Sequence, residues 1–366
     1  MTNAYVTLLY SASYLPGALT LANSIRDTHS VAGKLVVLVP KYDSHLFSSH
    51  QLRLLTSVYD EIIEVETVSP SSPADLHNLN CLLKRPELLK TLTKLKVFSL
   101  PYSKVVYLDS DVLVCANLDH LFEQNISDGE IMASPDSGWP DIFNTGVFMV
   151  APSPENYAAL NTIVSDEATN ASFDGADQGL LNEFFQSFGR FNTHGSRSWK
   201  RLPFLYNVTP SGQYQYNPAY KRFFKDIKAL HFIGSSKPWY RKVAASDVEE
   251  GSSEYDELTK LWWRNFYSHY GNDKDVSALI NDSDRMINSD RVKTGDYKIA
   301  KFDPVTNFSA LNLEEEEPTT DAVTTEIEDE PENKIGSVNK KMTIIDHMFH
   351  EHEVTAERQF GFDSLF

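Results

Sequence analysis

The chain has 366 residues, of which 41% are apolar and 12% aromatic, enough for a substantial buried core. A formal net charge of −18 argues against nucleic acid and anionic membranes as partners, because both attract surfaces rich in lysine and arginine. Two cysteines, Cys81 and Cys115, exclude a framework of several disulfides and predict a reducing, cytoplasmic environment. We expect neither a signal peptide nor a membrane span, since the first residues lack a basic region and every apolar run is short.

Strand and helix patterns alternate from the start of the chain. Apolar runs predict strands at residues 4–9, 34–39 and 61–65, and amphipathic spacing predicts helices at residues 15–26 and 50–57. This alternation indicates an α/β fold with a mostly parallel sheet and helices on both faces. Ligands of such folds gather where the strands end.

A further apolar run, residues 104–108, ends at two carboxylates, Asp109 and Asp111. If the chain stays extended there, both side chains point to the same side of the strand. Two neighbouring anions repel each other unless a cation lies between them, and carboxylate oxygens suit Mg²⁺ or Mn²⁺. The alternative is a solvated acidic turn, which is common in proteins.

Predicted helices and strands also alternate through the rest of the first 270 residues. We expect helices at residues 86–100, 154–167, 177–188 and 255–270, strands at residues 131–135, 144–150 and 229–233, and irregular structure at residues 202–220.

After residue 270 the composition changes. Residues 271–341 are polar and carry an acidic stretch that opens at Glu314, which predicts a disordered linker. Residues 342–366 regain aliphatic and aromatic side chains, as in segments that fold onto a partner. The alternative is a tail that docks on its own domain.

Several motifs in residues 1–270 resemble those of the glycogenins, which belong to the retaining UDP-sugar transferases of GT-A fold. They include Lys84-Arg85-Pro86-Glu87-Leu88, Asp109-Ser110-Asp111, Gly138-Trp139-Pro140-Asp141, Phe143-Asn144-Thr145-Gly146, Asp174-Gly175-Ala176-Asp177-Gln178, His231-Phe232-Ile233-Gly234 and Lys237-Pro238-Trp239. The resemblance implies a glucosyltransferase domain of GT-A type with a Rossmann-like sheet over residues 1–270.

The resemblance also implies a set of site residues. It assigns Mn²⁺ to Asp109, Asp111 and His231, a choice that the mixture of carboxylate and imidazole ligands supports. Catalytic roles fall to Lys94 and Asp177. Substrate contacts are implied for Leu8, Tyr10, Ser11, Tyr14, Arg85, Lys94, Asp109, Ser110, Asp111, Asn144, Thr145, Asp174, Asp177, Gln178, His231, Gly234 and Lys237.

Tyr10 and Ser11 depart from the Thr-Asn pair usual in the family, so Tyr10 is a candidate for stacking on uracil. The pair Asp174-Gly175 could instead form only a turn that caps the next helix.

The implied reaction is self-glucosylation. Tyr214 stands at the place of the family's acceptor tyrosine, and Tyr216 is a second candidate. Glucose from UDP-glucose would pass to this hydroxyl and a short α-1,4-glucan would grow on it in a homodimer, with glycogen synthase bound through residues 342–366. One alternative is a galactinol-type transferase that acts on a free small acceptor, and another is a protein whose main task is to tether glycogen synthase.

Overall fold

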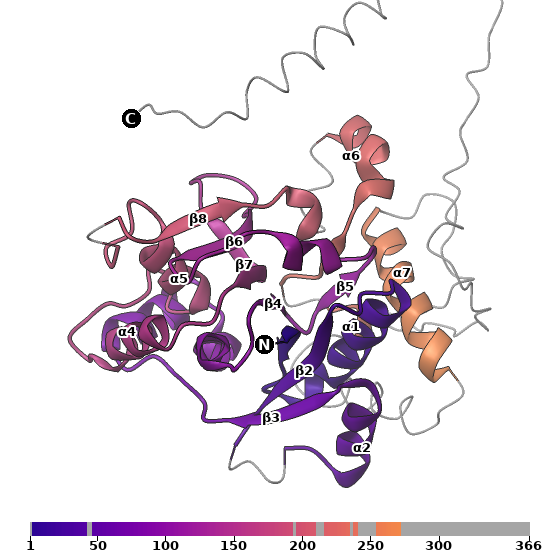
Figure 1. Ribbon diagram of the computed structural model, residues 1–366, viewed down its shortest axis with the longest axis horizontal. Coiled ribbons are helices and arrows are strands. Elements are labelled where there is room, and N and C mark those ends of the chain that lie inside the picture. The colour runs from indigo at the N-terminus through magenta and orange to yellow at the C-terminus, as the bar shows by residue number, and fades with distance from the viewer. Residues whose placement is uncertain are drawn as a thin grey trace, which may run out of the picture. The chain divides into compact units, whose positions relative to one another are not determined.

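A seven-stranded sheet forms the centre of the computed structural model, with strand order β3-β2-β1-β4-β7-β6-β8 (Figure 1). The strands are β1 (Asn3–Leu8), β2 (Gly33–Pro40), β3 (Glu61–Val65), β4 (Val105–Leu108), β6 (Glu130–Pro135), β7 (Phe143–Val150) and β8 (Ser198–Arg201). The first four strands in sequence run parallel to one another, whereas β7 is antiparallel to both β4 and β6. The predicted mostly parallel α/β fold is confirmed.

The structure describes residues 2–41, 46–192, 195–209, 216–234, 237–240 and 254–271, and every structural statement below refers to these ranges. The chain divides into two units, residues 1–311 and 312–366, and the described residues all belong to the first. The predicted linker beyond residue 271 and the predicted partner-binding segment 342–366 lie outside the described ranges.

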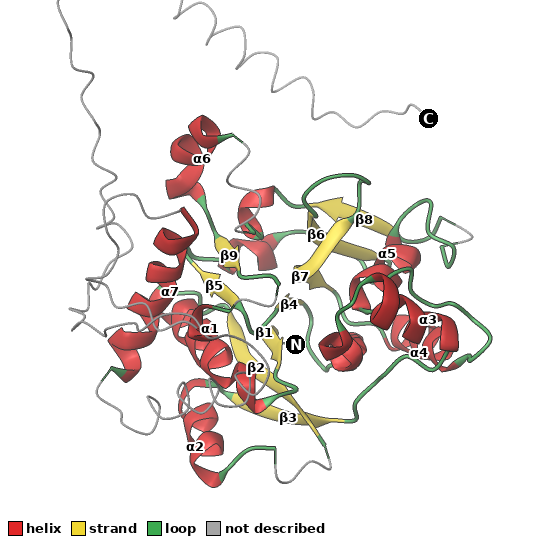
Figure 2. Cartoon of the chain, turned by 180° about the vertical axis from the view of Figure 1, so that it is seen from behind, coloured by secondary structure: helices red, strands yellow, loops and turns green. Residues whose placement is uncertain are grey.

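Helices cover both faces of the sheet. The described α-helices are α1 (Leu15–Asp27), α2 (Ser49–Val58), α3 (Pro73–His77), α4 (Pro154–Ser165), α5 (Asp177–Phe185), α6 (Asn217–Phe223) and α7 (Glu254–Tyr270), and a long 3₁₀ helix, η3, spans Pro86–Ser99. Of these, α1, α2 and α7 pack on one face, and η3, α4 and α5 pack on the other (Figure 2). None of the helices in the described ranges has the length and apolar character needed to cross a bilayer.

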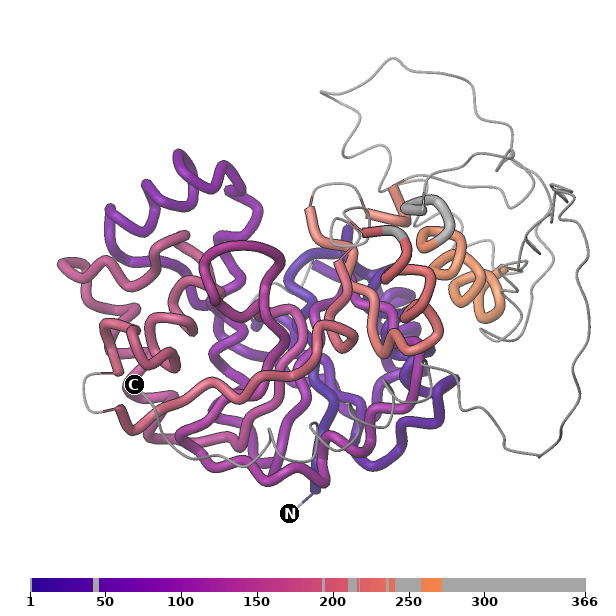
Figure 3. Tube along the Cα trace, turned by 90° about the horizontal axis from the view of Figure 1, so that it is seen from above, coloured from indigo at the N-terminus to yellow at the C-terminus, as the bar shows by residue number. Residues whose placement is uncertain are grey.

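Alternation along β1 explains this two-sided arrangement. Tyr5 joins the core under α1 and α7, while Ala4, Val6 and Leu8 join the core under η3 and α5, because successive side chains of a strand point to opposite faces. Helix α7, orange in Figure 3, packs against α1, where the amide nitrogen of Asn23 donates to the hydroxyl of Tyr270. The last helix of the described chain is therefore tied to the first.

Several local predictions differ from the structure. After β4 the chain turns instead of staying extended, and β5 (Val112–Val114) leaves the main sheet to pair antiparallel with β9 (Ala229–His231). Part of the segment predicted to be irregular forms the helix α6. The edge strand β8 escaped prediction because its sequence, Ser-Trp-Lys-Arg, lacks an apolar run.

Candidate active site

A tight turn at the end of β4 positions the two predicted carboxylates. The amide of Val112 donates to the carbonyl of Asp109 (3.0 Å), and the amide of Asp109 donates to the carbonyl of Gly146 on β7 (2.8 Å). The hydroxyl of Tyr107 donates to Oδ1 of Asp109 at 2.8 Å. The Asp109 side chain keeps 28% of its surface accessible, whereas Asp111 is buried. The turn therefore places one carboxylate at the edge of the site and one inside it.

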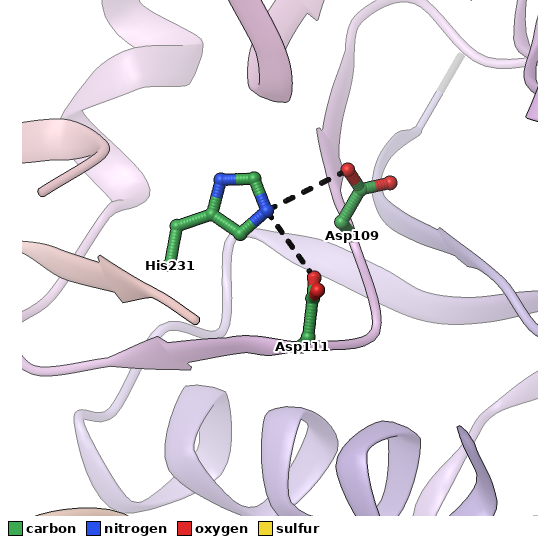
Figure 4. A group of neighbouring side chains, drawn as sticks. All are labelled: Asp109, Asp111 and His231. Carbon is green, nitrogen blue, oxygen red and sulfur yellow. Dashed lines mark ion pairs between the residues drawn. The ribbon is translucent and has the colours of Figure 1, made fainter. Parts of the chain in front are cut away.

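The imidazole of His231 faces both carboxylates (Figure 4). The register of β5 and β9 pairs Val112 with His231, so the histidine lies directly beside the acidic turn. Its Nε2 is 3.3 Å from Oδ1 of Asp111 and 3.8 Å from Oδ2 of Asp109. One ligand atom from each residue lies within 4.8 Å of the others, so the three can hold a metal ion.

Hydrogen bonds behind His231 determine which of its nitrogens faces the carboxylates. The amide of Gly146 donates to Oδ1 of Asn144 (2.9 Å), and the same oxygen accepts from Nδ2 of Asn207 (2.7 Å). Asn207 therefore turns its Oδ1 to His231 Nδ1 (2.9 Å), which must carry the hydrogen. In the neutral form of the ring, the lone pair of Nε2 points at two carboxylates. A divalent cation between them converts this repulsion into coordination, so the donor set fits a metal.

Two buried lysines flank the acidic turn. Lys94, 3% exposed, lies 3.0 Å from Asp109 and 2.6 Å from Asp177, and Lys237 pairs with Asp111. Burial tends to lower the pKa of Lys94, but the two carboxylates outweigh it and raise the pKa. Lys94 therefore remains a cation in the site.

The two carboxylates of the turn respond in opposite directions. Burial raises the pKa of Asp109, and Lys94 only partly offsets this effect. Burial acts the same way on Asp111, but the charges of Lys237 and His231 prevail and lower its pKa. Asp111 is thus held as the anion, as a metal ligand must be.

A second polar cluster lies next to Lys94, at the start of α5. Oδ2 of Asp177 accepts from Lys94 Nζ and from the hydroxyl of Thr145, both at 2.6 Å. Asp174 accepts from the amides of Ala176 and Gly179, so it makes the helix-capping contacts of the alternative prediction, and burial raises its pKa. It also lines the cleft described next, so capping does not exclude a substrate contact.

These groups line one cleft of about 320 Å³. The sequence-predicted residues that line it are Leu8, Tyr10, Tyr14, Arg85, Lys94, Asp109, Ser110, Asp111, Asn144, Thr145, Asp174, Asp177, Gln178, His231, Gly234 and Lys237. Their individual roles stay predictions.

Two predicted site residues, Ser11 and Tyr216, do not line the cleft, and a third falls outside the described ranges. Ser11 does not line the cleft; its hydroxyl accepts from the amide of Ser13 and caps a short 3₁₀ helix. Tyr214 lies outside the described residues. Tyr216 is 69% exposed, just before α6, and is not a lining residue.

The structure adds two residues that sequence reasoning missed. Asp136, at the end of β6, lines the cleft, and its Oδ2 accepts from Nε2 of Gln178 at 2.6 Å. Asn207 orients His231. The position of Asp136 directly after an apolar strand resembles that of Asp109 and could have drawn notice. The residues next to Asn207 in the sequence do not indicate that its side chain contacts His231.

The aromatic wall of the cleft comes from the first turn. The ring centroids of Tyr10 and Tyr14 are 5.6 Å apart, and Tyr14 meets Trp239 edge to face at 5.5 Å. Burial raises the pKa of both tyrosines, so they stay protonated at neutral pH. Both side chains line the cleft.

Comparison with known proteins identifies the family. The family model described as Glycosyl transferase family 8 matches residues 5–243. This chain belongs to glycosyl transferase family 8. It is therefore a glycosyltransferase, and the cleft with its metal-ligand triad is the candidate active site.

Curated relatives within the family include glycogenins. Glycogenin of Neurospora crassa is 40% identical over 76% of this chain, and mouse glycogenin-1 is 38% identical over 76%. The matched region spans 37% of the Neurospora protein and 49% of human glycogenin-2, but 81% of mouse glycogenin-1. The resemblance to glycogenins is thus confirmed.

A solved structure shows a related fold. The apo structure of the bifunctional glycosyltransferase WbbM matches with a TM-score of 0.51 and 16% identity, over 78% of this chain and 52% of that chain. This likeness concerns the fold alone and agrees with the predicted glycosyltransferase architecture.

Proposed function

We propose that this family 8 transferase glucosylates itself, passing glucose from UDP-glucose to Tyr214, with Tyr216 as a second acceptor, and then building a short α-1,4-glucan. One observation carries the proposal: in a homologue of glycogenins, the cleft that holds Asp109, Asp111 and His231 also holds the pair Lys94 and Asp177. Metal ligands and a buried cation–anion pair together suit a nucleotide-sugar donor.

The donor end of the cleft is built for a diphosphate leaving group. Asp109, Asp111 and His231 would hold Mn²⁺, which when bound supplies positive charge to the leaving UDP. Lys237, buried beside Asp111, provides a second positive charge at the same place. Tyr10 and Tyr14 offer ring faces for the uracil, and Arg85 lines the same cleft. An acidic protein thereby gains the local positive charge that a nucleotide requires.

Transfer breaks the bond between the sugar C1 and the diphosphate oxygen and forms a bond from C1 to the acceptor oxygen, while the acceptor hydroxyl loses its proton. Positive charge develops at C1. Asp177 can stabilise this charge or attack C1, and Lys94 and the hydroxyl of Thr145 hold the carboxylate that would do so. A covalent sugar on Asp177, trapped and seen by peptide mass spectrometry, separates the two routes.

The acceptor segment supports transfer to a tyrosine. Tyr216 presents its phenol to solvent close to the start of α6, so it can be modified without unfolding the domain. We propose a homodimer in which one subunit glucosylates the other, and a cytoplasmic protein that recruits glycogen synthase through residues 342–366. Loss of glycogen synthase binding on deletion of residues 342–366 is the expected result; undiminished binding contradicts that role.

Intact mass spectrometry tests the proposal. Incubation of the full chain with UDP-glucose and Mn²⁺ should add increments of one hexose, and parallel incubation with UDP-galactose tests the choice of sugar. A Tyr214→Phe/Tyr216→Phe double variant should gain none while it still releases UDP slowly. Hexose increments on the double variant contradict the acceptor assignment. UDP release that gives no mass gain but rises with added polyols indicates a transferase for free acceptors.

A further inference from the structure

Trp139 has the most exposed side chain among the described large apolar residues, at 96%. It lies in the short connection between β6 and β7, outside the residues that line the cleft. An indole this exposed keeps its flat apolar face free, so a ligand of matching size can cover it.

The connection holds Trp139 in a defined place. The amide of Asp136 donates to the carbonyl of Ile142 and the amide of Ile142 to the carbonyl of Pro140, both at 2.8 Å, which closes the turn. Gly138 has φ +106°, a backbone conformation that residues with a side chain rarely adopt. The indole is therefore presented on a structured turn.

The same connection starts in the wall of the cleft. Asp136 lines the cleft and accepts from Gln178, whose Oε1 in turn accepts from the amide of Thr145. Trp139 follows Asp136 by three residues, so its backbone is within about 11 Å of that wall. A molecule that extends out of the cleft beside Asp136 therefore has a span of only about 11 Å to the backbone of Trp139.

We propose that Trp139 is a stacking platform for the glucose rings of the growing glucan, an acceptor subsite outside the cleft. The inference rests on the proposed self-glucosylation and adds a residue that governs elongation. A pyranose ring has apolar C–H faces that pack on an aromatic face and a rim of hydroxyl groups. Ser137 and Asp141, on either side of Trp139 in the sequence, supply partners for such hydroxyls, and the uncharged glucan is not repelled by an acidic protein.

A sugar fits this surface better than a protein partner does. Trp139 stands among polar neighbours in the sequence, Asp136, Ser137 and Asp141, and not within a continuous apolar run. A stable protein interface needs a broad buried area with an apolar centre. One flat aromatic ring beside carboxylates and a hydroxyl is enough for a sugar, because a ring-sized ligand can cover it.

The test compares the full-length wild type with Trp139→Ala and Trp139→Phe. Labelled maltopentaose serves as a free acceptor, and intact mass gives the lengths of the self-attached glucans. We expect Trp139→Ala to raise the KM for maltopentaose about tenfold with little change in kcat, and to shorten the glucans. Trp139→Phe, which keeps an aromatic face, should restore most of the affinity. Phe188→Ala, which removes another exposed aromatic ring (65%), should behave as wild type.

The outcomes separate this inference from the proposed function. If the wild type adds hexoses, but Trp139→Ala leaves both the KM and the glucan lengths unchanged, the platform is refuted and self-glucosylation stands. If wild-type dimers dissociate in Trp139→Ala on analytical ultracentrifugation, the indole belongs to a subunit interface and the platform is likewise refuted. If the wild type adds no hexose to itself or to maltopentaose, the proposed function is refuted, and the platform that rests on it is refuted with it.

Discussion

Replacing Gly146 by alanine should displace His231 and weaken metal binding. A Cβ at this position would lie 2.1 Å from Cε1 and 2.4 Å from Nδ1 of the imidazole, far inside ordinary contact distance. Restoring a contact of about 3.4 Å requires the ring to move by more than about 1 Å, whereas metal–ligand distances tolerate only about 0.2 Å. We therefore expect the affinity for Mn²⁺ to fall about 10–100-fold, as when a group that orients a ligand is lost.

The assay is titration with Mn²⁺, followed by calorimetry and by the rate of UDP release from UDP-glucose. Gly33→Ala is the matched control, because it also adds a methyl group to a strand of the sheet but meets the Phe122 ring at 3.0 Å and the backbone of Ala4 at 3.3 Å instead of His231. It should leave the Mn²⁺ affinity unchanged. Thermal unfolding reports any general loss of stability, expected to be about 1–3 kcal/mol for an overpacked site. If Gly146→Ala binds Mn²⁺ as tightly as Gly33→Ala does, His231 is not the ligand inferred from this geometry.

Three further outcomes follow from the site and from the fold. Lys94→Met should lower the free energy of unfolding, measured in urea, by about 3–5 kcal/mol and suppress UDP release, because it leaves the buried carboxylate of Asp177 without its cation beside Asp109. Equal stability of wild type and variant would contradict the pairing. Asp119 accepts from the hydroxyl of Tyr5 and from two backbone amides before β2, and although burial acts to raise its pKa, these hydrogen bonds lower it. Asp119→Asn should therefore lower the free energy of unfolding by about 1–2 kcal/mol at pH 7. In urea titrations this difference from wild type should shrink as the pH falls below about 4, because the wild-type carboxylate is then protonated. A difference independent of pH would contradict this. EDTA should abolish UDP release, and Mn²⁺ should restore it better than Mg²⁺; full activity in EDTA would exclude a metal role.

Sequence patterns predict the sheet well because its central strands are continuous apolar runs. They identify Asp109 and Asp111 because these carboxylates interrupt such a run at its end. The same patterns do not show which residues from other parts of the chain the fold brings next to these two carboxylates. The motif resemblance singled out His231, while the strand pairing that delivers it, Val112 with His231, joins residues far apart in sequence.

Side-chain networks were the least predictable part. Asn207 fixes the tautomer of His231 through contacts with Asn144, and nothing in the local sequence of either asparagine encodes that pairing. The sequence also leaves open whether the chain turns at Asp109 or stays extended, because apolar residues lie on both sides of the two carboxylates. Tertiary hydrogen bonds decided both features, so periodicity could not reveal them.

The central claim is that Asp109, Asp111 and His231 hold the metal that binds the leaving nucleotide. Anomalous diffraction at the manganese edge, from crystals soaked in Mn²⁺ and UDP, tests it most directly. The expected result is a single strong peak bounded by Oδ atoms of both aspartates and Nε2 of His231, with diphosphate oxygens on its open side. A peak elsewhere, or UDP bound in the cleft with no metal among these three residues, would contradict the claim.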